Sequence, residues 1–140
     1  MILRQTAKYA LRAMATLASL PAGESMPAGR LAEFTDIPIH YLSKIMRRLV
    51  VEGLVHSRRG HGGGFSLAKP ARKISFASIL AASDFEVIKD ECAYGWGKCD
   101  PDDRCPLHST YARLKECVEG WIHNTTLADM DRDGRVTDPE

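Results

Sequence analysis

The 140-residue sequence predicts a mainly α-helical protein with one small β-hairpin. Apolar residues recur every three or four positions in segments 5–20, 38–52 and 106–125, which is typical of helices with one buried face. A glycine-rich turn at residues 59–64 separates two short strand-like runs. The length and the hydrophobic fraction of 44% suit one domain, or a small domain with an extension.

The N-terminal half is expected to contain three helices. The first covers about residues 5–20, the second 28–34 and the third 38–52. Asp36 is the expected N-cap of the third helix, and Gly53 is expected just after its end. The third helix is expected to bury one stripe, formed by Ile39, Leu42, Ile45, Met46, Leu49 and Val50.

The hairpin and two further helices complete the expected elements. Residues 54–58 and 65–68 read as strands on either side of the glycine-rich tip. A fourth helix is expected over 75–83, and a long helix over 106–125. One face of the long helix carries Leu107, Tyr111, Leu114, Val118, Trp121 and Ile122.

The charges divide the chain into two parts. Residues 1–73 hold 12 Lys and Arg against 4 Asp and Glu, a net charge of +8, whereas residues 74–140 hold 7 against 14, a net charge of −7. This split suggests a polyanion-binding module joined to a part with a second function, although two solvated faces of unlike charge would give the same counts. No run of 18 apolar residues is present, so no membrane helix is expected.

The order helix, helix, turn, helix, hairpin is that of a winged helix-turn-helix, which places helix 38–52 in the DNA major groove. Eight residues are expected at the DNA: His40, Tyr41, Ser43, Lys44, Arg47, Arg48, Arg58 and Arg59. The first four are near the helix N-terminus, where base edges are reached, and Arg47 and Arg48 are expected at phosphates. Arg59 at the wing is expected in the minor groove. Tyr41 and one of Arg47 and Arg48 also have a purely structural interpretation.

Three cysteines and a histidine form a second motif with the spacing C-x6-C-x5-C-x2-H. Cys92, Cys99, Cys105 and His108 fall within 17 positions of a glycine- and aspartate-rich stretch, the expected ligand loop 88–105. Such ligands suit a metal or an iron–sulfur centre. Structural zinc is the alternative, but its usual tight C-x2–4-C pairs are absent. Cys117 is not expected to join these ligands, since it lies about 18 Å along a helix from Cys105. It is expected to be buried or at an interface.

These motifs together resemble the Rrf family of winged-helix transcription regulators, which includes IscR-like and NsrR-like iron–sulfur sensors. The resemblance covers about residues 1–128. Its carriers are Tyr9-Ala10-Leu11-Arg12-Ala13-Met14, Ile39-His40-Tyr41-Leu42-Ser43-Lys44-Ile45, Gly53-Leu54-Val55, Arg59-Gly60-His61-Gly62-Gly63-Gly64-Phe65-Ser66-Leu67, the three cysteines and Asn124-Thr125-Thr126-Leu127-Ala128-Asp129.

The resemblance implies a homodimer held by the long C-terminal helix, with one cluster per subunit at the three cysteines and His108. His108 favours the [2Fe–2S] cluster of the IscR-like branch over [4Fe–4S]. The loop departs from that branch, with six residues between the first two cysteines where five is usual. NsrR-like members take a carboxylate from the partner's first helix, and here Lys8 occupies the comparable position.

The charge split, the polar stretch after residue 129 and the resemblance together predict three regions and a class of function. Residues 1–73 would form the DNA-binding region, 74–128 the cluster loop and dimerisation helix, and 129–140 a polar, disordered tail. The chain is then a cytoplasmic regulator of double-stranded DNA and not an enzyme, and the alternatives are a cluster-free regulator of the same fold and a small electron carrier. Residues 129–140 also match the EF-hand calcium pattern, but no exiting helix follows, and a chance match in an acidic tail is the simpler interpretation.

Overall fold

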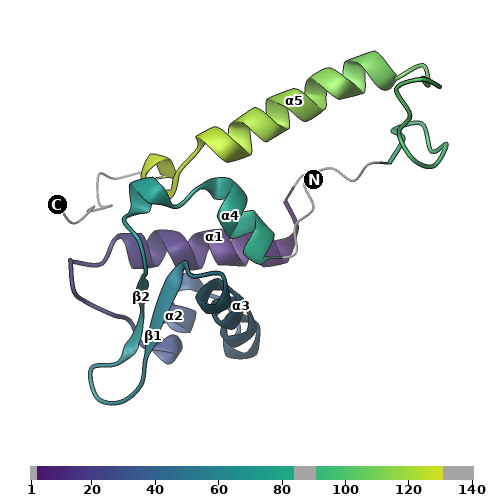
Figure 1. The fold of residues 1–140 in the computed structure, drawn as a ribbon. Helices are drawn as coiled ribbons and strands as arrows, with labels where there is room; N and C mark the ends of the chain where they lie inside the picture. Colours follow the sequence, from purple (N-terminus) through teal and green to yellow (C-terminus); the bar gives the residue numbers. More distant parts are fainter. Residues whose placement is uncertain (1–2, 84–90, 131–140) are drawn as a thin grey trace.

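The computed structural model describes residues 3–83 and 91–130, and it has the predicted mainly α-helical architecture with one hairpin (Figure 1). The elements in chain order are α1 (Gln5–Ala18), α2 (Ala28–Thr35), α3 (Ile39–Val51), β1 (Val55–Arg58), β2 (Gly64–Leu67), η1 (Ala71–Lys73), α4 (Phe76–Ala82), α5 (His108–Asn124) and η2 (Leu127–Met130). Among the described residues, none of the helices combines the length and the hydropathy that a membrane span requires.

Helix α1 lies at the centre of the body. It packs against α2, α3 and β2, and also against α4 and η2. Its buried face is built largely from alanines, so neighbouring backbones approach it closely, and Met14 and Leu17 fill the space between them. Most of the fully buried large side chains belong to the core cluster that includes this helix: Met14, Leu31, Leu42, Met46, Leu49, Ile74, Ile79 and Leu127.

Helix α3 buries four of the six residues expected in its stripe, namely Leu42, Ile45, Met46 and Leu49. The expectation for Ile39 is wrong, since its side chain is 49% exposed. Ile39 is the first residue of α3, and at this end of the helix its side chain does not reach the core. Val50 is only half-buried at the other end of the helix.

The turn between α2 and α3 differs from the prediction. Asp36 does not cap α3, which begins after Pro38 without a side-chain cap. Asp36 instead ends α2 in the left-handed conformation, with φ 55°. The amides of Asp36 and Ile37 donate to the carbonyls of Glu33 and Ala32 at 3.4 and 3.1 Å. This is the Schellman geometry, which accounts for a positive φ at a residue other than glycine.

The end of α3 follows the prediction. Gly53 has φ 74°, and its amide donates to the Val50 carbonyl at 3.0 Å. The amide of Leu54 donates to the Leu49 carbonyl at 3.0 Å, which completes a second Schellman motif. The chain therefore leaves α3 directly into the hairpin.

The hairpin pairs Val55 with Leu67 and Arg58 with Gly64 in antiparallel register. A third segment adds to it, because Met26 exchanges two backbone hydrogen bonds with Phe65, at 2.9 and 2.8 Å. This contact requires a glycine beside it. Gly64 has φ 141°, and a Cβ atom there would lie 2.4 Å from the backbone of Met26.

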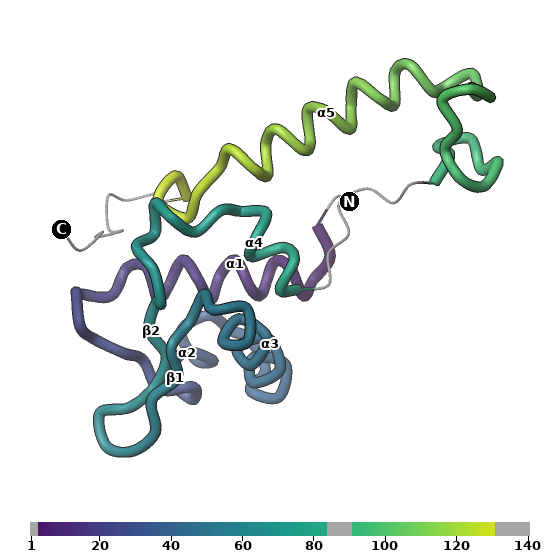
Figure 2. The backbone as a smooth tube through the Cα atoms, viewed as in Figure 1, coloured from purple at the N-terminus to yellow at the C-terminus, as the bar shows by residue number. Residues whose placement is uncertain are grey.

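Helix α5 extends away from the body, and the loop before it forms the far tip of the molecule (Figure 2). Its C-terminal end is anchored where Ile122 packs with Ala7, Phe76 and Leu80. The ring of Trp121 meets that of Phe76 edge to face at 4.9 Å. Along the rest of the helix the predicted apolar face is largely uncovered: among its six members only Ile122 is buried.

Candidate functional site

Helix α3 presents the predicted DNA-reading face to solvent. His40, Tyr41, Ser43, Lys44, Arg47 and Arg48 are all exposed. The helical repeat groups them on the side opposite the buried stripe. The Ser43 hydroxyl donates to the Ile39 carbonyl at 2.9 Å, so its orientation is set by its own helix. The structure brings these six residues together on one surface.

The ring of Tyr41 is in contact on two sides. The His40 ring centroid lies 4.3 Å away and the Tyr9 ring centroid 6.4 Å away, in tilted arrangements. The side chain is still 51% exposed. Tyr41 therefore has both an accessible edge and a contact with helix α1.

The wing carries the two remaining predicted DNA residues. Arg58 ends β1, Arg59 follows it in the tip, and both are exposed. The tip is tied to the body, because the Ser25 hydroxyl donates to the Gly62 carbonyl at 3.0 Å. The two arginines therefore lie on a hairpin that is held to the body at strand β2, by Met26, and at the tip, by Ser25.

Two of the hollows among the described residues lie beside helix α1. One, of about 560 Å³, lies between the start of α1 and α3, and Arg4, Tyr9, Tyr41, Lys44 and Arg48 are among its lining residues. Its basic lining extends the reading face towards α1.

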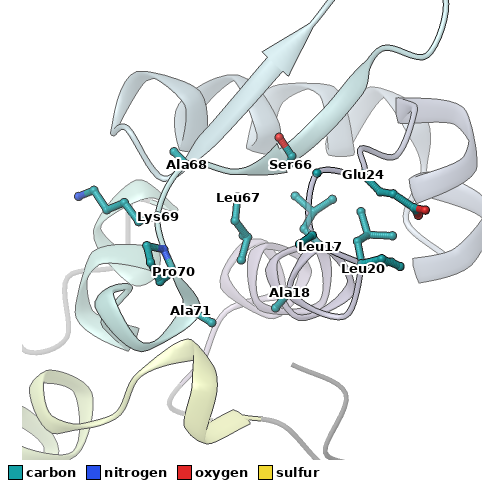
Figure 3. Close-up of a pocket in the computed structure, with 13 residues that line it drawn as sticks. Leu17, Ala18, Leu20, Glu24, Ser66, Leu67, Ala68, Lys69, Pro70 and Ala71 are labelled. Carbon is teal, nitrogen blue, oxygen red and sulfur yellow. The ribbon is translucent and has the colours of Figure 1, made fainter. Parts of the chain in front are cut away.

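The other hollow, of about 260 Å³, lies between the end of α1 and strand β2 (Figure 3). Leu17, Leu20 and Leu67 point into it, while Glu24 and Lys69 extend outwards from its rim. It has an apolar floor with no charged side chain directed into it.

The loop before α5 brings the four predicted ligands to one end of the helix as two pairs. The sulfur of Cys99 lies 3.5 Å from Nδ1 of His108, the first residue of α5. The Cys105 side chain lies close enough to Cys92 to contribute to the lowered pKa of the Cys92 thiol. No three of the Cys, His, Asp and Glu side chains in residues 3–83 and 91–130 already surround a single point.

The local backbone favours the thiolate form at Cys92. The backbone amide of Trp96 makes the largest contribution to lowering the pKa of the Cys92 thiol, and the amides of Tyr94 and Gly95 and the Cys105 side chain act in the same direction. The turn is closed by the Cys92 amide, which donates to the Gly97 carbonyl at 2.7 Å. A thiolate is the form that ligates metals.

Cys117 does not belong to this loop. It lies in the middle of α5 and is exposed in the isolated chain. The expectation of a buried position within one chain is therefore wrong, and a position at an interface stays a prediction.

The acidic C-terminal motif lies almost entirely outside the described residues. Its first member, Asp129, accepts hydrogen bonds from the amide and hydroxyl of Thr126 at 2.8 and 3.0 Å. This carboxylate closes the turn η2. Residues 131–140, and the start of the predicted ligand loop at 88–90, are not described.

Tyr9 and Arg12 have no predicted role in the sequence beyond carrying the family resemblance. The Arg12 guanidinium lies 5.0 Å from the Tyr9 ring centroid, and its Nη1 donates to the Thr35 carbonyl at 2.9 Å. An aromatic and a cation three residues apart on a helix are neighbours on one face, which is the signal that points to this pair.

Comparison with known proteins connects these surfaces to a family. A family model described as Rrf2, iron-dependent transcriptional regulator, matches residues 3–133. The HTH-type transcriptional regulator IscR of Escherichia coli (strain K12 / DH10B) is 32% identical over 138 residues, covering 99% of this chain and 85% of that protein. The solved structure of T. potens IscR has a TM-score of 0.74 and 25% identity over 93% of this chain and 85% of that one.

A second solved structure supports the fold. CymR, the global cysteine regulator of B. subtilis, has a TM-score of 0.78 over 99% of both chains. Its sequence identity of 22% makes this a likeness of fold alone.

Proposed function

The chain belongs to the Rrf2 family of DNA-binding transcriptional regulators, and from this premise we propose that it binds its operator as a homodimer under the control of an iron–sulfur cluster. The observation that carries the proposal is the position of the four candidate ligands. Cys92, Cys99, Cys105 and His108 gather at one end of α5, and the other end of α5 is packed on the DNA-reading body.

The pairing of the ligands favours [2Fe–2S]. A [2Fe–2S] cluster takes two protein ligands at each iron. The loop offers two pairs, Cys92 with Cys105 and Cys99 with His108. A single zinc ion instead needs four ligands around one point, and a [4Fe–4S] cluster is the second candidate among iron–sulfur centres. When bound, the cluster supplies one-electron redox chemistry with a potential set by its hydrogen bonds and exposure.

The uncovered face of α5 supports a homodimer. Leu107, Leu114 and Trp121 are spaced by seven residues, and they are 44%, 52% and 45% exposed. Apolar residues at this spacing are typical of helices that pair along their length. A second copy of α5 would remove these side chains from water, and Cys117, three residues after Leu114, would lie near that contact.

The coupling between loop and DNA depends on α5 and its anchors. Cys105 and His108 are the two ends of the turn that leads into α5, since the His108 amide donates to the Cys105 carbonyl at 3.0 Å, so the arrangement of the loop sets where the helix begins. At the far end, the Phe76 amide donates to the Thr125 carbonyl and the Leu127 amide to the Ile74 carbonyl, both at 2.8 Å. We propose that two states of the loop correspond to two distances between the α3 helices of the two subunits. A ligand that binds one state of the loop more tightly than the other then shifts DNA binding.

The cluster is tested by the spectrum and composition of anaerobically purified protein. We expect a visible chromophore with iron and acid-labile sulfide together, and its loss on replacing Cys92, Cys99 or Cys105 by alanine. His108→Ala should leave a weaker or altered spectrum. Cys117→Ala is the matched control and should leave the spectrum unchanged. Zinc without sulfide, or loss of the chromophore in the Cys117 variant, would refute the ligand set.

DNA binding is tested by selection from a random duplex library, followed by footprinting. A two-fold symmetric dimer should select an inverted repeat whose half-sites are about 34 Å apart. The affinity should fall steeply with salt, since each subunit makes several phosphate contacts. Protection of one isolated half-site by a monomer would contradict the dimer.

Two other functions are outcomes of the same experiments. Operator binding that is normal without any bound metal would favour a cluster-free regulator of the same fold. A chromophore without selective DNA binding would favour an electron carrier, a function for which the exposed basic face of α3 and the wing has no use.

A further inference from the structure

We propose that Tyr9 and Arg12 of α1 are positioning residues that set the DNA sequence preference through Tyr41. The inference rests on the proposed use of α3 as the reading helix. Neither residue needs to touch DNA for this role, because Arg12 contacts the end of α2 and Tyr9 contacts the start of α3.

One pair of side chains, Tyr9 and Arg12, holds both ends of the α2–α3 turn. Arg12 donates to the carbonyl of Thr35, the last residue of α2, at 2.9 Å. Tyr9, three residues earlier on α1, contacts Tyr41 in the first turn of α3 with a centroid distance of 6.4 Å. The Arg12 guanidinium over the Tyr9 ring, at 5.0 Å, joins the two contacts.

The turn between Thr35 and Tyr41 is short and conformationally demanding. Asp36 has a positive φ of 55°, which is uncommon for a residue with a side chain. Pro38 starts α3 without a side-chain cap. The rotation of α3 about its axis is therefore set by its buried stripe and by the contacts that Tyr9 and Arg12 make at its beginning.

Tyr41 in turn contacts His40, a predicted base-reading side chain. The Tyr41 ring lies 4.3 Å from that of His40, which is exposed on the reading face. A change in the position of Tyr41 consequently displaces His40. Base discrimination depends on donor and acceptor geometry, whereas phosphate contacts tolerate small displacements, so removal of this support should reduce discrimination more than overall affinity.

The test measures discrimination directly. The wild-type chain first selects its preferred sequence from a random duplex library. The dissociation constant is then measured for that sequence and for versions with one base pair changed per half-site. Tyr9→Leu keeps an apolar side chain but removes the ring, and it should reduce the ratio of the two constants about tenfold, the scale of one good base contact. Tyr9→Phe should restore the ratio, because the ring contact does not use the hydroxyl.

Arg12 is tested with a charge-matched control. Arg12→Gln should reduce the ratio, while Arg30→Gln removes the same charge from exposed α2 and should leave the ratio unchanged. In a Tyr41→Leu background, Tyr9→Leu should cause no further reduction, because its effect passes through Tyr41. Thermal unfolding of each variant identifies any failure to fold, and Arg12→Gln with its Arg30→Gln control keeps the test valid if Tyr9→Leu is unstable.

The outcomes separate this inference from the proposed function. Failure of the wild-type chain to select any sequence would overturn DNA reading by α3. A wild-type preference that Tyr9→Leu and Arg12→Gln retain at full strength would overturn the positioning role alone. Equal reductions in the Tyr41→Leu and wild-type backgrounds would also overturn it, since Tyr9 would then act independently of Tyr41.

Discussion

Replacing Gly64 by alanine should destabilise the wing by about 3–5 kcal/mol. The new Cβ would lie 2.4 Å from the carbonyl carbon and oxygen of Met26, and both are backbone atoms that cannot move aside as a flexible side chain would. A residue forced to keep φ near 141° carries strain of about 1–3 kcal/mol. Relief requires β2 to move, which breaks the two hydrogen bonds between Met26 and Phe65, worth about 1 kcal/mol each.

Urea unfolding followed by circular dichroism measures this destabilisation. Gly62→Ala is the matched control, because Gly62 has φ 75° but no atom within 4 Å of its Cβ position. It should cost only about 1–2 kcal/mol, the strain of a residue with a side chain in the left-handed conformation. The Gly64 variant should also bind DNA more weakly, since β2 supports the arginines at the tip. Equal stability of the two variants would refute the close approach of Gly64 to Met26.

Three further predictions concern α5 and the DNA surface. Leu114→Glu should convert the dimer to monomers in sedimentation, whereas Arg113→Glu, away from the apolar face, should not; a stable dimer of the first variant would exclude this face. Phe76→Ala should lower the free energy of unfolding by about 3–5 kcal/mol, because it removes the anchor of α5. Arg47→Ala should weaken binding to all sequences alike and lower the salt slope by about one unit for each phosphate that is no longer neutralised. A change in sequence preference would contradict a phosphate contact.

The sequence was sufficient where the signal is local. The helical repeat predicted α1, α3 and the long helix α5, and glycine at position 53 predicted the end of α3. The glycine-rich tip between two strand-like runs predicted the hairpin. These features depend on backbone conformation and on which side of an element is apolar, and both are encoded within a few neighbouring residues.

Other local signals were misread because two structures compete for the same residue. Asp36 suits an N-cap, but the same short polar side chain tolerates the left-handed conformation that ends α2. Ile39 suits a buried stripe, but it lies at the first helical residue, beyond the reach of the core. Burial at the end of an element depends on where its neighbours stop, which the periodicity of one helix does not contain.

The sequence by itself determined the element order and the uneven charge, and it supplied the candidate residues for DNA contact and for metal binding. The tertiary structure alone decided which of them meet. It placed Tyr9 against Tyr41 and Arg12 against Thr35, sorted the loop ligands into two pairs, and left most of the apolar face of α5 uncovered. The physical reason is that these contacts join residues from different elements. Their distances follow from how the core packs as a whole, and no local pattern records that packing.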